Sequence, residues 1–283
     1  MATFYNQASL SFGGSVTNSN TTTGEIVAEL QMTKTSATSD YGPGDSITYV
    51  VNIVNSGDTD YSGISLTDDL GRVVFSPTLS VVPLTYVEGS VLYYLGGVLQ
   101  PAPMVTAGES LVIEGISVPA DSNVTIIYET RANAYAPLGA SASITNTVTA
   151  GGGACELSDS ATVPTRDEPI LTISKSVSPA VVTCAGEVTY TIVVQNTGNT
   201  EVVATDDLII NDVFNPTLSN ISVSLNGSEL EEGVGYSYNA TTGEFATLPG
   251  AITVPAATFM RDSVTGLITT TPGVAVLTVS GTV

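Results

Sequence analysis

The strongest constraint on this chain is an internal repeat. The stretch "LQMTKTSATSDYGPGDSITYVVNIVNSGDTD", beginning at Leu30, aligns with "LTISKSVSPAVVTCAGEVTYTIVVQNTGNTE", beginning at Leu171, at a constant offset of 141. The aligned pairs include Lys34 with Lys175, Tyr49 with Tyr190, and Asn55 with Asn196. A repeat of this length predicts two copies of one folded unit.

Apolar and polar residues alternate within each copy. The apolar positions are Ile47, Tyr49, Val51 and Ile53 in the first copy, and Val188, Tyr190, Ile192 and Val194 in the second. Alternation with a period of two is typical of strands that place one face on a core. The turn sequences Asn-Ser-Gly-Asp and Asn-Thr-Gly-Asn follow. We therefore predict an all-β fold of two tandem immunoglobulin-like β-sandwich domains, each with about seven short strands.

The repeat is out of phase with the chain. The first copy ends in "SITNTVTAGGGACELSDSATVPT", which predicts two strands around a Gly-rich loop, whereas the second stops after "TTTPGVAVLTVSGTV". We expect its last two strands to be missing. Their counterpart stands at the start, where "FYNQASLSFGG" aligns with "ITNTVTAGGG" at an offset of 140. The predicted units are an N-terminal donor-strand arm (1–28), domain 1 (29–165), and domain 2 (166–283), an incomplete sandwich completed by a neighbouring subunit's arm.

An incomplete sandwich leaves an open edge and an uncovered apolar groove, to which a strand can add. The arm has the matching alternation, because four residues share one face and form the expected donor-strand interface: Phe4, Ala8, Leu10 and Phe12. The arm could also fold back onto its own domain 2. Short connections at opposite ends of domain 1 favour a neighbouring subunit instead. Such a head-to-tail contact is heterologous, and it propagates into a filament unless it closes a ring.

Three polar side chains per domain lie in phase with apolar faces. They are Lys34, Asp68 and Asn146 in domain 1, and Lys175, Asp212 and the arm residue Asn6 in domain 2. Burial lowers the pKa of a lysine and raises that of a carboxylic acid, so neutral forms can compete. A neutral amine, a carboxamide and a protonated acid can form a Lys–Asn isopeptide bond.

The pattern thus predicts two crosslinks. Lys34 would join Asn146 within a subunit, assisted by Asp68, and Lys175 would join Asn6 of a neighbour, assisted by Asp212. The alternative is a buried Lys–Asp ion pair that is hydrogen-bonded to the asparagine. Intact mass distinguishes the two, because each crosslink releases one ammonia molecule.

Two cysteines, Cys155 and Cys184, are too few for a disulfide scaffold or for a zinc site in a chain without histidine. Two interpretations stay open. They are either free thiols or partners in a single disulfide at the junction of the two domains.

Composition excludes several functional classes. Six Lys and Arg against 27 Asp and Glu give a net charge of −21, which repels nucleic acid. We expect no membrane insertion, because no apolar run reaches the roughly 20 residues of a membrane span. No signal peptide is visible, because the N-terminus lacks a charged segment followed by an apolar one. The absence of histidine argues against an enzyme, and we expect no cofactor and no metal site. The acidic loops "SGDTDYSG" and "ATDDL" lack the ligand spacing of a known calcium loop.

Four blocks together resemble a family of bacterial surface repeats called domain of unknown function 11: "KTSATSDYGPGDSITYVVNIVNSGD", "LTDDL", "ISVPADSNVTIIYETRA" and "ITNTV". The resemblance covers both repeats and implies extracellular β-sandwiches with a structural role, without catalytic residues. A Met start without a signal peptide is similar to the circumstances of spore-appendage subunits. We therefore expect a self-assembling filament subunit on a bacterial cell or spore surface, with itself as partner. The alternative is an adhesin or glycan-binding module.

Overall fold

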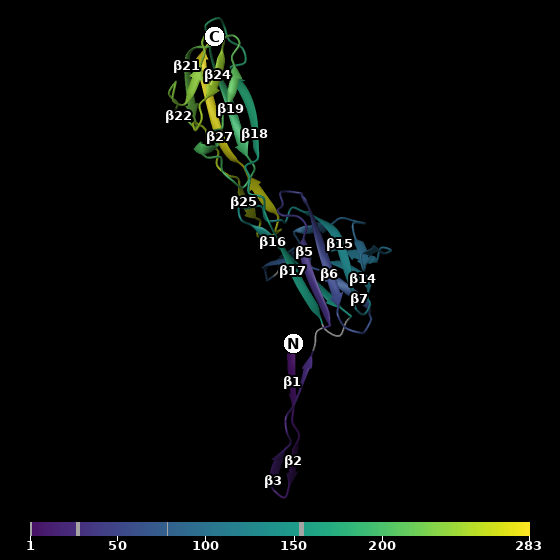
Figure 1. The fold of residues 1–283 in the computed structure, drawn as a ribbon. Helices are drawn as coiled ribbons and strands as arrows, with labels where there is room; N and C mark the ends of the chain where they lie inside the picture. The colour runs from purple at the N-terminus through teal and green to yellow at the C-terminus, as the bar shows by residue number, and fades with distance from the viewer. Residues whose placement is uncertain (1, 27–28, 78, 153–155) are drawn as a thin grey trace.

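The computed structural model describes residues 2–26, 29–77, 79–152 and 156–283. The chain is all-β, with two tandem β-sandwich domains preceded by a β-hairpin, which confirms the fold class predicted from the sequence (Figure 1). Within those ranges the only helical segment is the 3₁₀ turn η1 (Ala204–Asp206). No helix in the described ranges is long and apolar enough to cross a membrane.

The N-terminal hairpin, residues 2–26, is called the arm. The end of the arm next to domain 1 pairs β1 (Ala2–Asn6) with β4 (Thr22–Ile26). The far tip pairs β2 (Ser9–Phe12) with β3 (Ser15–Asn18). Gly13 and Gly14 both have positive φ, as a two-residue hairpin turn requires. Every residue from 3 to 23 is exposed. An isolated two-stranded ribbon is marginally stable in water. No described residue outside the arm buries the apolar side chains of residues 3–23.

Domain 1 is a closed sandwich of two sheets. One sheet has the strand order β12-β11-β15-β6-β5, with β10 on β15, and the other has β13-β14-β7-β16-β17. The sheets hold six and five strands, more than expected, because the connection between β7 and β14 forms short strands of its own. The strands are β5 (Leu30–Ser36), β6 (Ser46–Asn55), β7 (Tyr61–Asp68), β8 (Val73–Ser76), β9 (Leu79–Val81), β10 (Leu84–Tyr86), β11 (Leu92–Leu95), β12 (Val98–Leu99), β13 (Met104–Ala107), β14 (Leu111–Val118), β15 (Ser122–Ala132), β16 (Ser143–Gly151) and β17 (Leu157–Pro164).

The core of domain 1 follows the alternation in its sequence. Ile47, Tyr49, Val51 and Ile53 on β6 are all fully buried, and β16 and β17 bury Ile144, Val148 and Val163 from the other sheet. β17 also lies beside β5, where the Lys34 N–H donates to Asp159 Oδ2 at 2.6 Å. The last two strands of domain 1 therefore cover its core and one sheet edge.

Domain 2 repeats most of this topology. Its larger sheet, β18-β19-β27-β21-β22, corresponds to β5-β6-β15-β11-β12, and its smaller sheet, β20-β24-β23, corresponds to β7-β14-β13. A further hairpin, β25–β26, stands before β27. The strands are β18 (Leu171–Ser178), β19 (Glu187–Asn196), β20 (Asn211–Val213), β21 (Ser219–Leu225), β22 (Ser228–Glu229), β23 (Tyr236–Tyr238), β24 (Glu244–Thr247), β25 (Thr258–Arg261), β26 (Ile268–Thr271) and β27 (Gly273–Thr282).

Domain 2 has no counterpart of β16 and β17 among the described residues. β20 pairs only with β24, so its other edge has no strand partner in that part of the chain. All eight residues of β18 are exposed, whereas its counterpart β5 buries Leu30 and Lys34. An open edge and an uncovered face thus occur where domain 1 has its last two strands.

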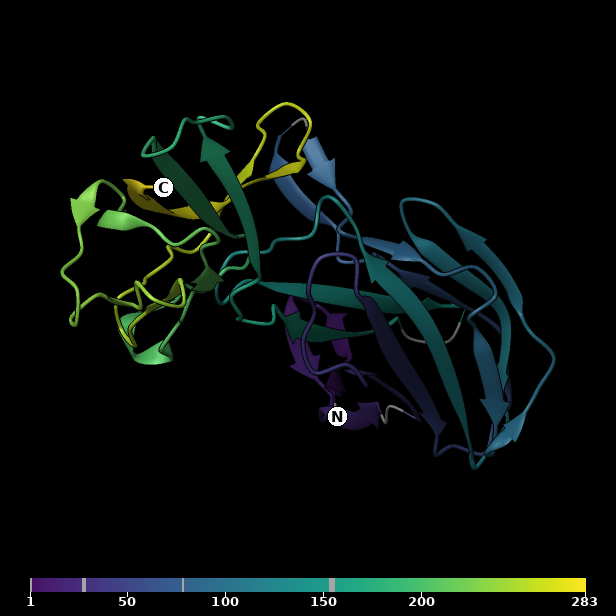
Figure 2. The same cartoon turned by 90° about the horizontal axis from the view of Figure 1, so that it is seen from above.

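The two domains meet at a junction built from a short linker and the β25–β26 hairpin. Arg166 in the linker pairs with Asp40 at 2.8 Å and Asp45 at 3.0 Å in domain 1. From domain 2, Arg261 Nη2 donates to the Tyr135 carbonyl, and Ile268 N–H donates to the Ala134 carbonyl, both at 3.0 Å. Seen from above, the two sandwiches are separate bodies (Figure 2). The arm and domain 2 lie at opposite ends of the molecule (Figure 1).

Candidate functional site

The structure brings Lys34 and Asp68 into contact inside domain 1. Lys34 lies on β5 and Asp68 ends β7, on the facing sheet, and Lys34 Nζ is 2.5 Å from Asp68 Oδ2. The two side chains are 0% and 2% exposed. Asp68 Oδ1 also accepts the Leu70 N–H at 2.9 Å, and Oδ2 accepts the Tyr128 hydroxyl. Burial lowers the pKa of Lys34, and the attraction of Asp68 opposes this shift only in part.

Asn146 completes the buried polar group from β16. It is fully buried, and neither its Oδ1 nor its Nδ2 has a hydrogen-bond partner in the described part of the chain. Its carboxamide acts on the pKa of both Tyr49 and Tyr128, and so it lies beside both phenols. Buried carboxamides are almost always hydrogen-bonded, because an unpaired one costs its full desolvation free energy. An unpaired buried carboxamide therefore calls for an explanation.

Two tyrosines enclose the amine. The rings of Tyr49 and Tyr128 lie 5.7 Å apart, and Lys34 Nζ is 4.8 Å and 5.9 Å from their centroids. Burial raises the pKa of both phenols, so both stay neutral at ordinary pH. The rings help to exclude water from the amine.

The three groups are reactants for amide exchange. Such an exchange would begin with transfer of a proton from Lys34 to Asp68 and attack of Nζ on Cγ of Asn146. A bond forms between Nζ and Cγ, and the bond between Cγ and Nδ2 breaks. Asp68 relays one amine proton to Nδ2, which leaves as ammonia, and its own proton polarises the carbonyl.

Removal of the Asp68 carboxylate is expected to destabilise domain 1 strongly. Asp68→Asn leaves Lys34 buried without its counter-ion, which costs about 3–5 kcal/mol of unfolding free energy. Urea unfolding followed by circular dichroism measures this. A matched control is Glu109→Gln, which breaks a surface pair between Arg72 and a glutamate side chain that is 83% exposed. That change should cost under about 1 kcal/mol. Equal losses in both variants would contradict a buried ionic role for Asp68.

Domain 2 has a lysine and an aspartate in the places of Lys34 and Asp68, but both are more exposed to solvent. Lys175 on β18 contacts Asp212 on β20, and their side chains are 38% and 16% exposed. Lys175 Nζ lies 4.5 Å from the centroid of Tyr190 and 5.0 Å from that of Phe214. The cross-strand partner of Tyr49 is Tyr128, whereas that of Tyr190 is Val279, so Asp212 receives no phenol from that strand.

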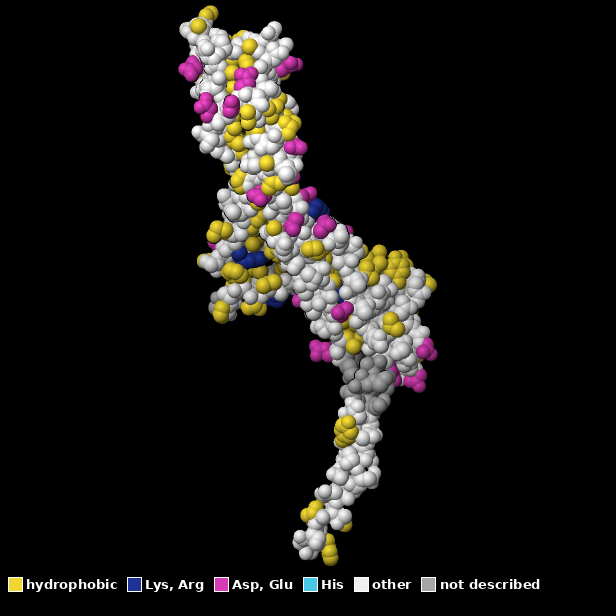
Figure 3. Space-filling view, turned by 60° about the vertical axis from the view of Figure 1, so that its left-hand side comes forward, with side chains coloured by type: hydrophobic (Ala, Val, Ile, Leu, Met, Phe, Trp, Pro, Cys, Tyr) yellow, Lys and Arg dark blue, Asp and Glu magenta, His cyan; other side chains and the backbone are white. Residues whose placement is uncertain are grey.

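The structure does not bring Asn6 to this second group. Asn6 lies on β1 of the arm, opposite Thr22, and is exposed. The expected interface residues are also exposed: Phe4 by 56%, Leu10 by 68% and Phe12 by 85%, with Ala8 likewise in the exposed class. Figure 3 shows uncovered hydrophobic side chains along the arm. Their counterparts in β16, Ile144, Val148 and Ala150, are buried.

Cys184 is exposed in the turn between β18 and β19. The neighbouring Ala185 N–H donates to the Val283 carbonyl, which places this turn at the far tip of domain 2 rather than at the domain junction, where the disulfide interpretation would put it. Cys155 lies outside the described residues, so its pairing stays a prediction.

Two contributors were missed by the sequence analysis. Tyr128 stood only within a quoted sequence block and was not singled out, although it alternates in phase with the buried Val124 and Ile126. Asp159 was not singled out, yet it shares a face of β17 with Ala161 and Val163 and caps the Lys34 N–H. Polar residues in phase with buried neighbours were the available signal for both. No group of three or more His, Cys, Asp or Glu side chains in the described ranges could hold a metal ion.

Comparisons with known proteins give matches by fold only. Neither a family model nor a curated protein sequence matches the chain. Among solved structures, a pilus backbone protein of Streptococcus pneumoniae has 11% identity and a TM-score of 0.36, covering 87% of this chain and 56% of that one. A C-terminal fragment of the major pilin of Streptococcus agalactiae has 10% identity and a TM-score of 0.34, covering 87% and 91%. The collagen-binding subdomain of the Enterococcus faecalis surface protein ACE has 9% identity and a TM-score of 0.33, covering 50% and 99%.

Proposed function

We propose that this protein is a structural subunit of a bacterial cell-surface or spore-surface filament. The arm of one subunit completes domain 2 of the next by donor-strand complementation. The observation that carries the proposal is a match between two parts of one chain. Domain 2 has an exposed β18 and an unpaired β20 edge in the described part of the chain, and the arm carries the sequence pattern of the two strands that fill these places in domain 1.

The register of the tip of the arm supports this assignment. At the offset of 140, the arm pair Ser9 and Asn18 corresponds to the pair Thr149 and Ser158 in domain 1, and both are directly opposed. β2 and β3 therefore pair in the register of β16 and β17. Burying the arm's large apolar side chains would contribute about 5–9 kcal/mol before the cost of ordering. That free energy is sufficient for stable association.

Chain length favours a neighbouring subunit over closure within one chain. An arm that fills the groove as far as Ile26 leaves residues 27–29 as its connection to β5, and three residues span at most about 10 Å. Domain 1 lies between the arm and domain 2, and β15 alone, with 11 residues, is about 36 Å long. An arm cannot reach its own domain 2 over that length without giving up its strands.

The resulting contact is head-to-tail. The arm lies at one end of the molecule and domain 2 at the other, so each added subunit presents a new arm or a new incomplete domain 2. Heterologous contacts of this kind grow as linear polymers. The resemblance to bacterial surface repeats favours an extracellular location.

We further propose that isopeptide bonds strengthen the filament. Lys34, Asp68 and the unpaired Asn146 would react within each subunit, because they are already enclosed. Lys175 and Asp212 would react with Asn6 only after a neighbour's arm covers them, since Lys175 is 38% exposed before that. Crosslinking between subunits would thus depend on assembly.

Imaging and mass measurement of the full chain test this proposal. Negative-stain microscopy of the purified protein should show linear filaments one molecule wide. Intact mass of the monomer should be lower than the sequence mass by one ammonia molecule, from domain 1 alone. Monodisperse single-subunit particles at every concentration would refute the filament. A monomer mass equal to the sequence mass would refute the internal crosslink but not the filament.

A further inference from the structure

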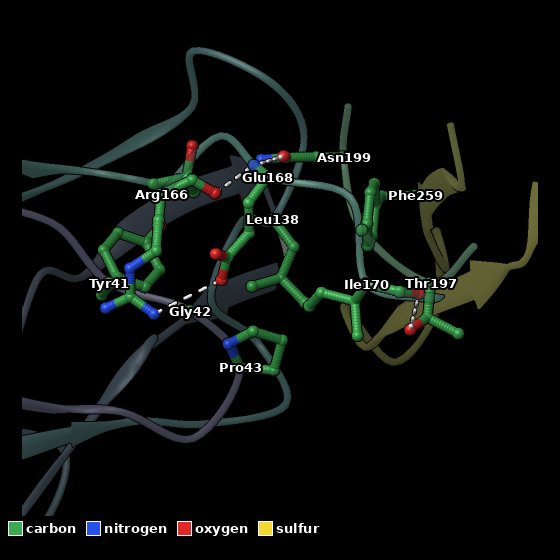
Figure 4. A pocket seen from close by; sticks show the side chains of 12 residues that line it. Tyr41, Gly42, Pro43, Leu138, Arg166, Glu168, Ile170, Thr197, Asn199 and Phe259 are labelled. Carbon is green, nitrogen blue, oxygen red and sulfur yellow. Dashed lines mark hydrogen bonds and ion pairs between the residues drawn. The ribbon is translucent and has the colours of Figure 1, made fainter. Parts of the chain in front are cut away.

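The domain junction contains a hollow that domain 1, the linker and domain 2 build together, with apolar side chains on part of its wall and polar ones such as Arg166 and Asn199 on the rest. Pro43 and Leu138 come from domain 1, Ile170 from the linker and Phe259 from β25, and their side chains converge on it (Figure 4). Ile170 is 38% exposed. Two arginine anchors fix this junction, Arg166 on Asp40 and Asp45, and Arg261 on the Tyr135 carbonyl. The hollow is therefore a preformed feature of the joint.

Phe12 is the arm residue that has no apolar counterpart in domain 1. At the offset of 140 it takes the position of Gly152, whose φ is +90°. A Cβ there would lie 2.9 Å from the Gly63 carbonyl oxygen, so the early part of β7 leaves no room for a side chain. Yet the arm places a phenylalanine at this position, and 85% of it is exposed.

Domain 2 lacks the strand that fills this space in domain 1. Aligning Asp68 with Asp212 puts Tyr61–Gly63 on Thr205–Asp207, which form the end of η1 and a turn rather than a strand. β20 begins only at Asn211. The strand residue that blocks a side chain at Gly152 therefore has no strand counterpart at this place in domain 2.

The register also places the arm tip at the junction. In domain 1, β17 runs beside β5, and Asp159, the third residue of β17, accepts the N–H of Lys34, the fifth residue of β5. Glu29 precedes β5 and Leu30 opens it. Their counterparts in domain 2 are Ile170 and Leu171, because the repeat offset is 141. An arm that pairs in the β16–β17 register thus brings Gly13 and Gly14 beside Ile170, at the mouth of the hollow.

We propose that Phe12 of the incoming arm packs over this hollow, against Ile170 and Phe259. The proposal rests on the proposed donor-strand function and adds a specific binding site for the arm tip of a second copy. The tip then contacts groups from both domains of the acceptor. Packing of Phe12 on the hollow would fix the register of the arm in domain 2. It would also make the joint between the two domains of the acceptor more rigid.

The chain contains no tryptophan, so Phe12→Trp introduces a single indole fluorophore at the anchor. On assembly, its emission should shift to the blue and its quenching by acrylamide should fall several-fold. Tyr5→Trp is the control, because Tyr5 lies on the opposite face of β1 and corresponds to the exposed Thr145. Its emission should change little.

Acceptor variants locate the contact. Phe259→Ala or Ile170→Ala, made in the Phe12→Trp chain, should restore much of the quenching, whereas Met260→Ala should not, because Met260 is 71% exposed and does not line the hollow. Phe12→Ser should raise the critical concentration for assembly about 10- to 100-fold, the equivalent of one buried phenyl ring.

The outcomes separate this inference from the filament itself. Filaments of the Phe12→Trp chain whose indole stays as exposed as in the monomer would overturn the anchor and leave donor-strand assembly intact. Protection of that indole that is insensitive to both junction variants would also overturn it, because the ring would then be buried elsewhere. An absence of filaments from the unmodified chain would overturn both proposals.

Discussion

Deletion of residues 1–28 is expected to abolish filaments while both domains remain folded as far as they fold in the full-length monomer. The arm is the only donor in the proposed contact, and its exposed residues 3–23 bury nothing in an isolated subunit. The critical concentration should rise beyond any accessible range, because about 5–9 kcal/mol of apolar burial is lost. Negative-stain microscopy and sedimentation of the truncated chain measure this, and circular dichroism checks that its sheets persist.

The truncated chain is also expected to inhibit assembly by capping one end of the filament. It retains the acceptor groove of domain 2 but has no arm to donate, so it can occupy one filament end and stop growth there. Mixing it with the full chain should shorten filaments in proportion to its molar fraction. If each arm instead closed on domain 2 of its own chain, the truncated chain would not shorten filaments at any ratio of truncated to full-length chain. Filaments of unchanged length from the truncated chain alone would refute donor-strand assembly.

Lys175→Ala is expected to remove the covalent link between subunits without removing the filament. Full-length filaments boiled in detergent should give a ladder of multimers, and the Lys175→Ala filaments should give monomers only. Lys34→Ala is the matched control, because it removes the equivalent lysine of the other domain. Its ladder should persist while the mass deficit of each monomer disappears.

The asparagines provide an independent check on the same bonds. Asn6→Ala should reproduce the loss of the ladder, and Asn146→Ala should reproduce the loss of the internal mass deficit. A ladder that survives both Lys175→Ala and Asn6→Ala would contradict the proposed bond. Loss of the ladder in Asn146→Ala alone would mean that the two sites had been assigned to the wrong contacts.

The two lysine sites illustrate how structure adds chemistry to a sequence pattern. Lys34 is closed in by Tyr49, Tyr128 and the strand that carries Asn146. Lys175 has Tyr190 and Phe214 on one side but has no strand over it in the described part of the chain. The same residue types are thus preorganised in one domain and open in the other. That difference gives a physical reason for the second bond to wait for assembly.

Much of the fold followed from alternation and repetition. The alternating residues on β6 are buried as predicted, and Lys34 and Asp68 point inward because they share strand parity with apolar neighbours. Parity fixes the face of a strand but not which strands face each other across a core. For that reason the contact between Tyr128 and Asp68 and the cap of Asp159 on the Lys34 N–H were not foreseen.

Loop positions were the least predictable part. One of the two interpretations of the cysteines put the Cys184 turn at the domain junction, but the turn lies beside Val283 at the opposite end of domain 2. Direction along a strand cannot be read from its alternation, so the end at which a turn emerges depends on how the strands are ordered in the sheet. The junction hairpin β25–β26 has no counterpart in the described part of domain 1, and therefore the repeat could not predict it.

The sequence by itself determined the all-β class, the duplication, the inward faces of the strands and the placement of a β16–β17 pattern at the front of the chain. These are properties of residue order, since a period of two and a constant offset need no knowledge of distant contacts. Only the tertiary structure decided that β20 has an edge unpaired by any described strand, that β18 is uncovered, and that the arm extends from the opposite end of domain 1. Those properties depend on which segments pack together across the sandwich, and packing between segments distant in sequence is set by side-chain fit in three dimensions.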